Sequence, residues 1–359
     1  MTEHKIIFGD SRSLNQIKDK SVQLIITSPP YWQLKDYGTE DQIGFNDSYE
    51  EYINNLNLVW KECNRVLSDG CRLCINIGDQ FARSVYYGRY KVIPIRTEII
   101  RFCESLGMDY MGAIIWQKTT TMNTSGGGAI MGSFPYPRNG ILKMDYEFIL
   151  LFKKLGNAPK PTQQQKEQSA MTKEEWGQYF SSHWNFNGVK QMGHIAMFPE
   201  ELPKRLIKMF SFAGETVLDP FAGSGTTLLA AKNLGRNSIG YEINKDFEPI
   251  IREKLGADQL RLGDDAKVIF AEDEIGNISS FDQLPYIFSD PHRMDKKVDV
   301  KKLQFGSKID QSEAKRDELF GVKQVIASDK IELSNGLVVR LLGIKPNPLY
   351  QGQAISFLQ

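Results

Sequence analysis

Residues 24–38, LIITSPPYWQLKDYG, place groups that could do chemistry at the end of an apolar run. Pro29 and Pro30 separate Ser28 from Tyr31, and because proline fixes its own backbone torsion, this corner of the chain is rigid. The corner holds a hydroxyl oxygen, which is a hydrogen-bond acceptor, and aromatic rings at fixed positions. Read alone, the same pattern is also typical of a turn that ends a strand.

A second stretch, residues 215–244, reads ETVLDPFAGSGTTLLAAKNLGRNSIGYEIN. An expected strand ending in Asp219 runs into a glycine-rich turn where a helix begins, and a second strand ends in Glu242. Glycines let a backbone approach a ligand closely, and an acidic residue after the next strand can accept hydrogen bonds from ribose hydroxyls. The stretch lacks the third glycine of a dinucleotide motif and the Lys-Ser/Thr of a P-loop. It favours a nucleoside-like ligand and gives no strong case for a pyrophosphate.

The elements that position these motifs are short β-branched runs, which alternate with helix-length segments through the first two thirds of the chain. Runs that are apolar on both faces predict a mainly parallel sheet with helices on each side. After about residue 265 the alternation stops, and QVIASDKIELSNGLVVRLLGIKP predicts a β-hairpin with its turn at Asn335 and Gly336. The expected helices cover residues 49–67, 95–106, 199–210 and 226–234.

The composition is typical of a soluble globular protein. Of 359 residues, 41% are hydrophobic and 25% are charged, with 44 basic and 44 acidic side chains. Without a global positive charge, binding of nucleic acid would need basic residues clustered locally. We find no signal pattern and no run long enough to span a bilayer, so we expect a cytoplasmic location. The four cysteines lack disulfide or metal-ligand spacing, so we expect them in the core and expect no metal site.

In combination, these motifs resemble one family. DPFAGSGTT followed by GYE is similar to the S-adenosyl-L-methionine (AdoMet) binding half of the amino-methylating DNA methyltransferases, and TSPPYW resembles their catalytic motif. The catalytic motif comes first, as in the circularly permuted β-class of these enzymes, many of which are partners of restriction endonucleases. IIFGDS, ECNRVLSDGCRLCINIGD and HIAMFPEELPKRLI extend the resemblance over residues 1 to about 250.

The resemblance implies an α/β fold, the AdoMet-dependent methyltransferase Rossmann-like fold, with a mostly parallel seven-stranded sheet. It implies that Asp10 lies near the AdoMet adenine, although Asp264 and Asp265 could compete for this contact, and that Phe198 packs beside AdoMet. The cofactor-binding residues that it implies are Asp10, Phe198, Asp219, Phe221, Gly223, Ser224, Gly225, Thr226, Thr227 and Glu242.

The resemblance also implies that Ser28, Pro29, Pro30 and Tyr31 form the catalytic site. An exocyclic amino group is a weak nucleophile because its lone pair is delocalised into the base. The Ser28 hydroxyl oxygen and the Pro29 carbonyl would accept hydrogen bonds from its two N–H groups and turn the lone pair toward the methyl group of AdoMet. Tyr31 would stack on the base after the base leaves the duplex.

Serine at position 28 is associated within this family mainly with N4-cytosine methylation, so we expect a site-specific cytosine-N4 DNA methyltransferase. N6-adenine methylation by the same class is an alternative, since either base offers an NH2 group to an acceptor oxygen. An alternative of another kind is a DNA-binding protein that has lost catalysis. A further alternative is a methyltransferase of protein glutamine, since the corner also resembles the Asn-Pro-Pro-Tyr motif of those enzymes. Their motifs come in the opposite order to those of this chain.

The expected partner is double-stranded DNA, with a restriction endonuclease that acts separately. Residues 153–193 are expected to form a target-recognition insertion. Its lysines could contact phosphate, and its aromatic side chains could support a displaced base. The DNA-contacting residues that we predict are Lys118, Arg138 and Trp184, with Lys143 also beside the loop at residues 119–140. The expected domains are the catalytic half at 1–152, the target-recognition insertion at 153–193, the AdoMet-binding half at 194–265, and a linker with a small C-terminal β-rich module at 266–359.

Overall fold

The computed structural model describes most of the chain, in two compact units, residues 1–300 and 301–359. The described residues are 2–33, 41–82, 91–118, 135, 138, 140–142, 144–188, 198–257, 266–273, 278–291, 321–340 and 350–358. Some predictions fall outside them. These are most of the loop at 119–140, Lys143, the end of the insertion at 189–193, and Asp264 and Asp265.

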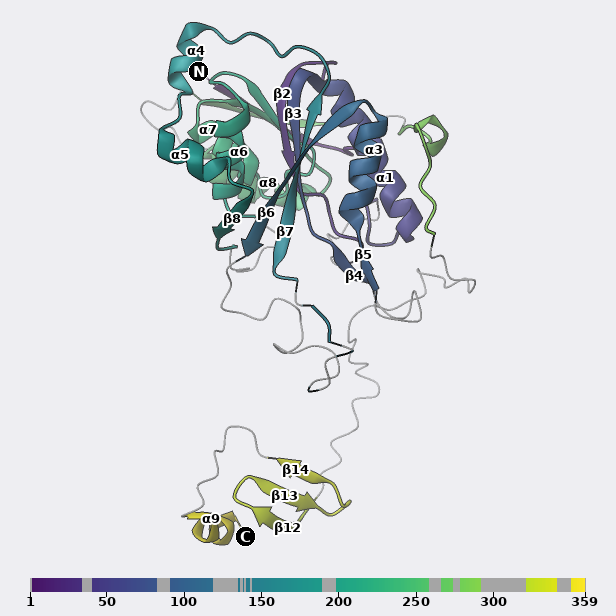
Figure 1. Ribbon diagram of the computed structural model, residues 1–359, viewed down its shortest axis with the longest axis vertical. Coiled ribbons are helices and arrows are strands. Elements are labelled where there is room, and N and C mark those ends of the chain that lie inside the picture. Colours follow the sequence, from purple (N-terminus) through teal and green to yellow (C-terminus); the bar gives the residue numbers. More distant parts are fainter. Residues whose placement is uncertain are drawn as a thin grey trace. The chain divides into compact units, whose positions relative to one another are not determined.

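Among the described residues, the first unit contains a sheet of nine strands in the order β11-β1-β10-β9-β2-β3-β7-β6-β8 (Figure 1). Neighbouring strands pair in parallel except at β7, which is antiparallel to β3 and β6. The predicted mostly parallel sheet is confirmed, but the predicted number of seven strands was wrong, because β11 and β8 extend the two edges. The strands are β1 (Thr2–Phe8), β2 (Val22–Thr27), β3 (Leu67–Ile77), β6 (Met108–Lys118), β7 (Tyr146–Lys154), β8 (His183–Phe186), β9 (Thr216–Asp219), β10 (Asn237–Glu242) and β11 (Ala266–Glu272).

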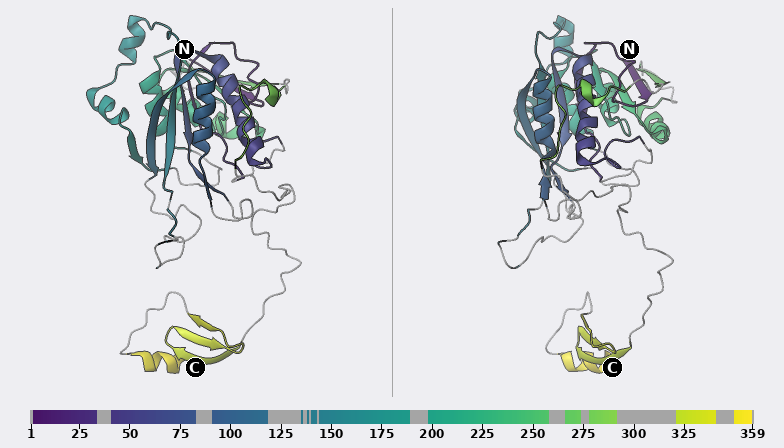
Figure 2. Two further views of the ribbon diagram at one scale, coloured as in Figure 1. Left: turned by 45° about the vertical axis from the view of Figure 1, so that its right-hand side comes forward. Right: turned by 90° about the vertical axis from the view of Figure 1, so that its right-hand side faces the viewer.

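Helices cover both faces of this sheet (Figure 2). Alternate side chains of β2 point to opposite faces, so Ile25 packs in the cluster that holds α1 and α3 residues, whereas Leu24 and Ile26 pack with α6. The four predicted helices are confirmed, with ends that shift by at most two residues. The helices that cover the two faces are α1 (Tyr49–Val66), α3 (Ile95–Ser105), α6 (Glu201–Phe210), α7 (Thr226–Asn233) and α8 (Glu248–Leu255).

The segment between β7 and α6 packs within the first unit. Two short helices, α4 (Gln163–Gln168) and α5 (Lys173–Tyr179), lead to β8, which pairs in parallel with the end of β6. The guanidinium of Arg205 on α6 lies over the rings of Tyr179, Trp184 and Phe186, at 5.1, 5.2 and 4.8 Å from their centroids. These cation–π contacts join β8 to α6 and hold it at the sheet edge.

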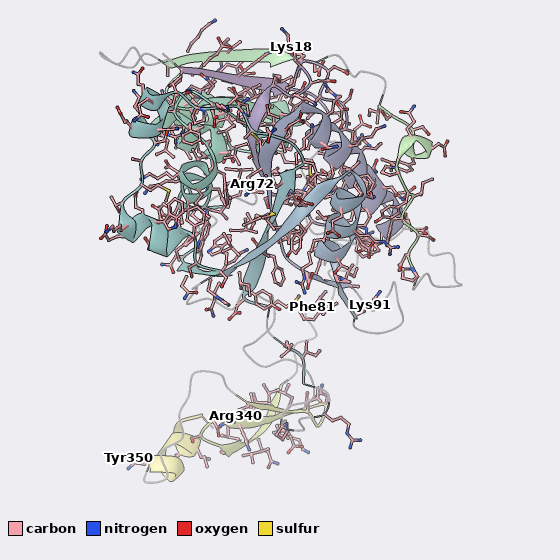
Figure 3. All side chains as sticks on the ribbon, turned by 45° about the horizontal axis from the view of Figure 1, so that its top comes forward. Lys18, Arg72, Phe81, Lys91, Arg340 and Tyr350 are labelled. Atoms are coloured by element: carbon pink, nitrogen blue, oxygen red, sulfur yellow. The ribbon has the colours of Figure 1, made fainter. Side chains whose placement is uncertain are left out.

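Strand β11 pairs with β1, so the sheet continues beyond residue 265, where the sequence pattern suggested that it stops. A short pair of strands, β4 (Gln80–Ala82) and β5 (Lys91–Ile93), forms a separate antiparallel sheet, and Figure 3 labels Phe81 and Lys91 on it. In the part of the chain that is described, no helix is long and apolar enough to cross a membrane.

In the described residues of the second unit, a three-stranded antiparallel sheet is followed by a helix. The predicted hairpin is confirmed as β13 and β14, and Gly336 takes a φ of 84° in the turn between them. Arg340, labelled in Figure 3, donates from Nε to Asp329 Oδ2 at 2.7 Å and ties β14 to the turn before β13. The elements are β12 (Val322–Ala327), β13 (Lys330–Leu333), β14 (Val338–Arg340) and α9 (Gln351–Leu358).

All four cysteines are buried, which confirms the prediction that they belong to the core. Burial raises the pKa of the Cys74 and Cys103 thiols, because a thiolate would lose its hydration. The thiols therefore stay protonated and pack as small apolar groups.

We predict that Gly240→Ala destabilises the first unit. A Cβ at Gly240 of β10 would lie 2.9 Å from Ala222 Cβ and 2.9 Å from Leu228 Cδ1, so the strand could not stay close to the glycine-rich turn and α7. Overpacking of this kind costs about 1–3 kcal/mol of unfolding free energy, to be measured by urea denaturation followed by circular dichroism. Gly177→Ala is the matched control: in α5 its Cβ would meet no atom within 4 Å, and alanine should add about 0.5–1 kcal/mol. Equal stability of the two variants would contradict the packing argument.

Candidate active site

The Ser-Pro-Pro-Tyr corner begins where β2 ends at the buried Thr27. The Tyr52 hydroxyl of α1 donates to the Pro30 carbonyl at 2.8 Å, which fixes the second proline. Trp32 is 3% exposed, and its indole N–H donates to the Asp47 carbonyl at 2.9 Å. The predicted rigidity of the corner therefore comes from α1 as well as from the two prolines.

A polar network lies beside this corner. The Tyr31 hydroxyl donates to Glu147 Oε1 at 2.9 Å and accepts from the Gly78 N–H at 2.8 Å. Asn76 Nδ2 donates to Glu147 Oε2 at 2.7 Å and lies 3.4 Å from the Ser28 hydroxyl oxygen, as a donor to it. Burial, with the nearby charge of Glu147, raises the pKa of Tyr31 well above its usual value, so this hydroxyl stays protonated.

The glycine-rich turn is joined to the corner through Asp219. This carboxylate is fully buried and accepts from the Thr27 hydroxyl at 2.8 Å, the Thr227 hydroxyl at 2.6 Å and the Phe221 N–H at 3.0 Å. Burial raises the pKa of Asp219 to about 6, and the three hydrogen bonds oppose that rise. Asp219 thus links the end of β2 to the start of α7.

Glycine is required twice in the turn, since Gly223 has a φ of 51° and Gly225 a φ of 79°. The Gly223 N–H donates to Glu242 Oε2 at 2.8 Å, and the Asn244 N–H donates to Glu242 Oε1 at 2.9 Å. Burial raises the pKa of Glu242 to about 7. The turn and the acidic residue predicted after the next strand are therefore in direct contact.

A pocket lies at the carboxyl ends of β1, β10, β9 and β2, and both sequence motifs contribute to it. Three residues that were not predicted, Tyr241, Ile243 and Phe247, add apolar surface to its wall. The predicted site residues that line the pocket are Asp10, Ser28, Pro30, Phe221, Gly223 and Glu242. This shared pocket confirms that the two motifs, far apart along the chain, meet in space.

Asp10 lines the pocket, but a neighbouring cation occupies its carboxylate. Arg12 Nη2 lies 2.6 Å from Asp10 Oδ2, and Arg12 Nε donates to both carboxylate oxygens. Arg12 also donates to Asn55 Oδ1 at 3.0 Å, which ties the pair to α1. A ligand that contacts Asp10 would therefore meet a carboxylate already paired with a guanidinium.

Other predicted cofactor residues lie outside the pocket wall. The hydroxyl oxygens of Ser224 and Thr226 accept hydrogen bonds from Lys254 Nζ of α8, at 2.7 and 3.1 Å, so α8 also stabilises the turn. Phe198 is partly buried and packs with the core cluster that contains Leu24 and α6 residues. These positions indicate support of the turn and of β2 rather than lining of the pocket.

The three predicted DNA contacts differ in exposure. Trp184 is 1% exposed, and its indole N–H donates to the Tyr179 carbonyl at 3.0 Å, so the ring belongs to the core and is not available to a displaced base. Lys118 is partly exposed at the end of β6, where it pairs with Glu147. Arg138 is exposed. The prediction for Trp184 is therefore corrected, because Arg205 and the edge of the sheet enclose its ring.

Sequence reasoning missed several residues of the site, among them Asn76, Glu147, Tyr52 and Lys254. Two of them carried a detectable signal. Asn76 interrupts the apolar run CINIG in β3, and Glu147 precedes the apolar run FILLF in β7. A polar residue within a buried strand needs a hydrogen-bond partner, and that need is the signal that could have found these two.

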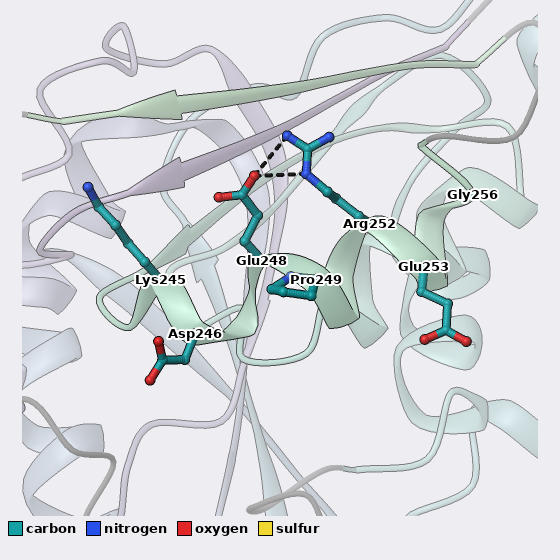
Figure 4. Close-up of a pocket in the computed structure, with 7 residues that line it drawn as sticks. All are labelled: Lys245, Asp246, Glu248, Pro249, Arg252, Glu253 and Gly256. Carbon is teal, nitrogen blue, oxygen red and sulfur yellow. Dashed lines mark hydrogen bonds and ion pairs between the residues drawn. The ribbon is translucent and has the colours of Figure 1, made fainter.

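A second hollow lies over η2 (Lys245–Phe247) and α8, on the outer side of the unit (Figure 4). The described residues that line it come from one local segment and include the ion pair between Arg252 Nη2 and Glu248 Oε1 at 2.8 Å. None of these lining residues belongs to either sequence motif. The pocket at the carboxyl ends of the strands is therefore the candidate active site.

Comparison with known families and sequences identifies relatives of this chain. A model of the DNA methylase family matches residues 22–253. The Type II methyltransferase M.MjaI of Methanocaldococcus jannaschii is 40% identical over 300 residues, which cover 75% of this chain and 96% of that protein. The Type II methyltransferase M.MthZI of Methanothermobacter thermautotrophicus is 35% identical over 279 residues, which cover 71% of this chain and 77% of that protein.

Solved structures show the same fold. A candidate DNA modification methylase from Thermus thermophilus, crystallised with AdoMet, is 36% identical, with a TM-score of 0.59 over 74% of this chain and 99% of that chain. The PvuII DNA methyltransferase, which is cytosine-N4-specific, is 18% identical, with a TM-score of 0.51 over 75% of this chain and 96% of that chain, and at this identity shows the fold alone. The predicted Rossmann-like methyltransferase fold is confirmed.

We predict that Asp219→Asn changes how stability depends on pH. An aspartate in the unfolded chain ionises near 3.8, whereas Asp219 in the folded protein ionises at about 6, so between these values the folded state holds more protons and loses stability as pH rises. Relative to Asp219→Asn, the wild type should lose at most about 3 kcal/mol of unfolding free energy between about pH 4 and pH 6.5. Urea unfolding at a series of pH values measures this difference.

Asp246→Asn, which removes an exposed carboxylate from η2, is the matched control for the loss of one negative charge. The pH-dependent difference from the wild type should be larger for Asp219→Asn than for this control. A constant difference between wild type and Asp219→Asn over the whole range would show that the pKa of Asp219 is the same in the folded and unfolded states, which contradicts the prediction.

Proposed function

Since the chain belongs to the DNA methylase family and is an AdoMet-dependent DNA methyltransferase, we propose that it methylates the N4 amino group of cytosine at a specific DNA sequence. The observation that carries this proposal is the pocket in which Ser28 and Pro30 share a wall with Phe221 and Glu242. A methyl donor held by the second pair of residues would lie beside an acceptor held by the first pair.

The pocket fits an adenosine group. Phe221, Ile243 and Phe247 offer apolar surface for the faces of a purine. In the buried Glu242 carboxylate, Oε2 accepts the Gly223 N–H and Oε1 accepts the Asn244 N–H, and a carboxylate oxygen can accept a further hydrogen bond, here from a ribose hydroxyl. The positive φ of Gly223 lets the backbone approach the ligand without a side chain between them. AdoMet, when bound, supplies an electrophilic methyl group.

The corner residues are proposed to orient the amino group. The Ser28 hydroxyl oxygen and the Pro29 carbonyl accept hydrogen bonds from its two N–H groups, which directs the nitrogen lone pair toward the methyl carbon. Tyr31, with its hydroxyl fixed by Glu147 and the Gly78 N–H, presents its ring to the base. Catalysis then depends on placement, because an error of about 1 Å in such a site can cost a factor of roughly 100 in rate.

The choice of cytosine rests on Ser28, because a serine in this motif is associated mainly with N4-cytosine methylation. N6-adenine is the alternative target, since its amino group offers the same two hydrogens. The order of the motifs, with the end of β2 before the turn after β9, supports assignment to the circularly permuted β-class. The names of the relatives, Type II methyltransferases, support a restriction endonuclease as a separate partner.

Double-stranded DNA is proposed to approach the carboxyl ends of the strands. Lys118 lies there beside Glu147, and the register of Lys118 with Phe186 brings the end of β8 to the same edge. Target recognition by residues 153–193 stays a prediction. Within this segment, β8 is the part that lies beside Lys118.

The experiment that tests the function is incubation with methyl-labelled AdoMet and mixed-sequence DNA, followed by nucleoside digestion and mass spectrometry. We expect N4-methylcytosine as the labelled nucleoside. N6-methyladenine would refute the assignment to cytosine but keep the class. Label found only on protein would refute action on DNA.

We predict that Pro30→Ala lowers kcat by about 10- to 100-fold and changes AdoMet affinity far less, because alanine frees the backbone torsion that fixes the corner. Single-turnover methylation measures the first effect and isothermal titration calorimetry the second. Pro159→Ala, in the exposed stretch before α4, is the control for loss of a proline and should behave as the wild type. Equal losses of turnover and AdoMet affinity in Pro30→Ala would contradict a role in positioning.

A further inference from the structure

Glu147 is the residue on which the network beside the catalytic corner converges. It is 9% exposed, and its carboxylate accepts hydrogen bonds from Tyr31, Asn76 and Lys118. Three adjacent strands bring these groups together: β3 carries Asn76, β7 carries Glu147 and β6 ends in Lys118. The partners therefore lie on the rigid sheet, apart from Tyr31 on the corner itself.

The charge of Glu147 determines which way the Asn76 amide faces. Asn76 is 3% exposed, and its NH2 group lies between Glu147 Oε2 at 2.7 Å and the Ser28 hydroxyl oxygen at 3.4 Å. If the amide were turned over, its oxygen would face a carboxylate oxygen, which is repulsive. Among the described residues, Asn76 Oδ1 has no hydrogen-bond partner, although a buried unpaired oxygen costs about 1–3 kcal/mol. The Asn76 amide thus keeps the orientation that lets its NH2 group donate to Glu147 and Ser28, although its oxygen then has no hydrogen-bond partner among the described residues.

We propose that Glu147 is a positioning residue for the acceptor amino group, an inference that rests on the proposed function. Through Asn76 it holds an N–H against one lone pair of the Ser28 oxygen, which turns the hydroxyl hydrogen away and leaves the other lone pair for the amino group. Directly, it fixes the hydroxyl of Tyr31 and with it the ring that faces the base. Both halves of the corner are therefore set by one buried carboxylate.

The test is Glu147→Gln, which keeps the shape of the side chain and removes its charge. A neutral amide no longer dictates the orientation of Asn76, so we expect kcat to fall by about 10- to 100-fold. The dissociation constant for AdoMet should stay within about twofold, because none of Glu147, Asn76 and Tyr31 lines the AdoMet pocket. Glu215→Gln is the matched control: this partly buried glutamate precedes β9, so it lies at the amino end of that strand, away from the corner that follows the carboxyl end of β2, and kcat should stay within about twofold.

A double-mutant cycle separates positioning from general destabilisation. In an Asn76→Ala background, Glu147→Gln should lower kcat by a smaller factor, because part of its effect passes through Asn76. The inference is overturned if the two factors multiply independently, if Glu147→Gln leaves kcat unchanged, or if AdoMet affinity falls as much as kcat.

Failure of the proposed function would be visible separately, as a wild type that methylates no DNA. The crystal structure of Glu147→Gln then decides the inference without any acceptor. We expect the Tyr31 hydroxyl to move beyond hydrogen-bond distance of the Gly78 N–H, or the Asn76 amide to leave Ser28. A corner that superposes on the wild type would overturn the inference.

Discussion

A hydrogen-bonded carboxylate inside the protein, that of Asp219, is the constraint on which the site depends. It accepts from Thr27, the last residue of β2, and from Thr227, in the first turn of α7. Burial of a charge without partners is costly, so the acceptor capacity of Asp219 must be filled by groups that the fold places around it. Strands β2 and β9 have to be neighbours for this to happen, and once they are, the corner and the glycine-rich turn share one pocket.

A second buried carboxylate, that of Glu147, stabilises the other side of the corner. Asp219 and Glu147 accept hydrogen bonds from different parts of the corner. Asp219 fixes where the corner leaves the sheet, whereas Glu147 fixes how the side chains beyond that point are oriented. Glu242 completes the set by holding the glycine-rich turn through the Gly223 N–H. Glu242 lines the pocket itself, whereas Asp219 and Glu147 lie behind it and hold the ends of the strands that carry it.

Much of this arrangement could be predicted from local sequence, because local physical rules produce it. Helix α1 begins after Ser48 because Ser48 and Glu51 exchange side-chain to backbone hydrogen bonds, a signal readable from four residues. The turn at Gly223 and Gly225 follows from backbone torsions that other residues avoid. The edge strands β8 and β11 escaped prediction because β8 has only four residues and β11 follows a break in the pattern. Contacts such as Asn76 with Glu147 join strands far apart in sequence, so no local rule could supply them.

The antiparallel direction of β7 determines where the connection between β6 and β7 begins and ends. Because β6 ends and β7 begins at the same edge of the sheet, the connection between them leaves and returns beside the catalytic corner. The Lys118 N–H donates to the Asp145 carbonyl at 2.9 Å and closes the base of that connection. The entropic cost of closing a loop grows only slowly with its length, so residues can be inserted or removed above this closure while Lys118 and Glu147 keep their places. Within one scaffold, the length of this connection can therefore diverge while the contacts among Lys118, Glu147 and Asn76 are retained.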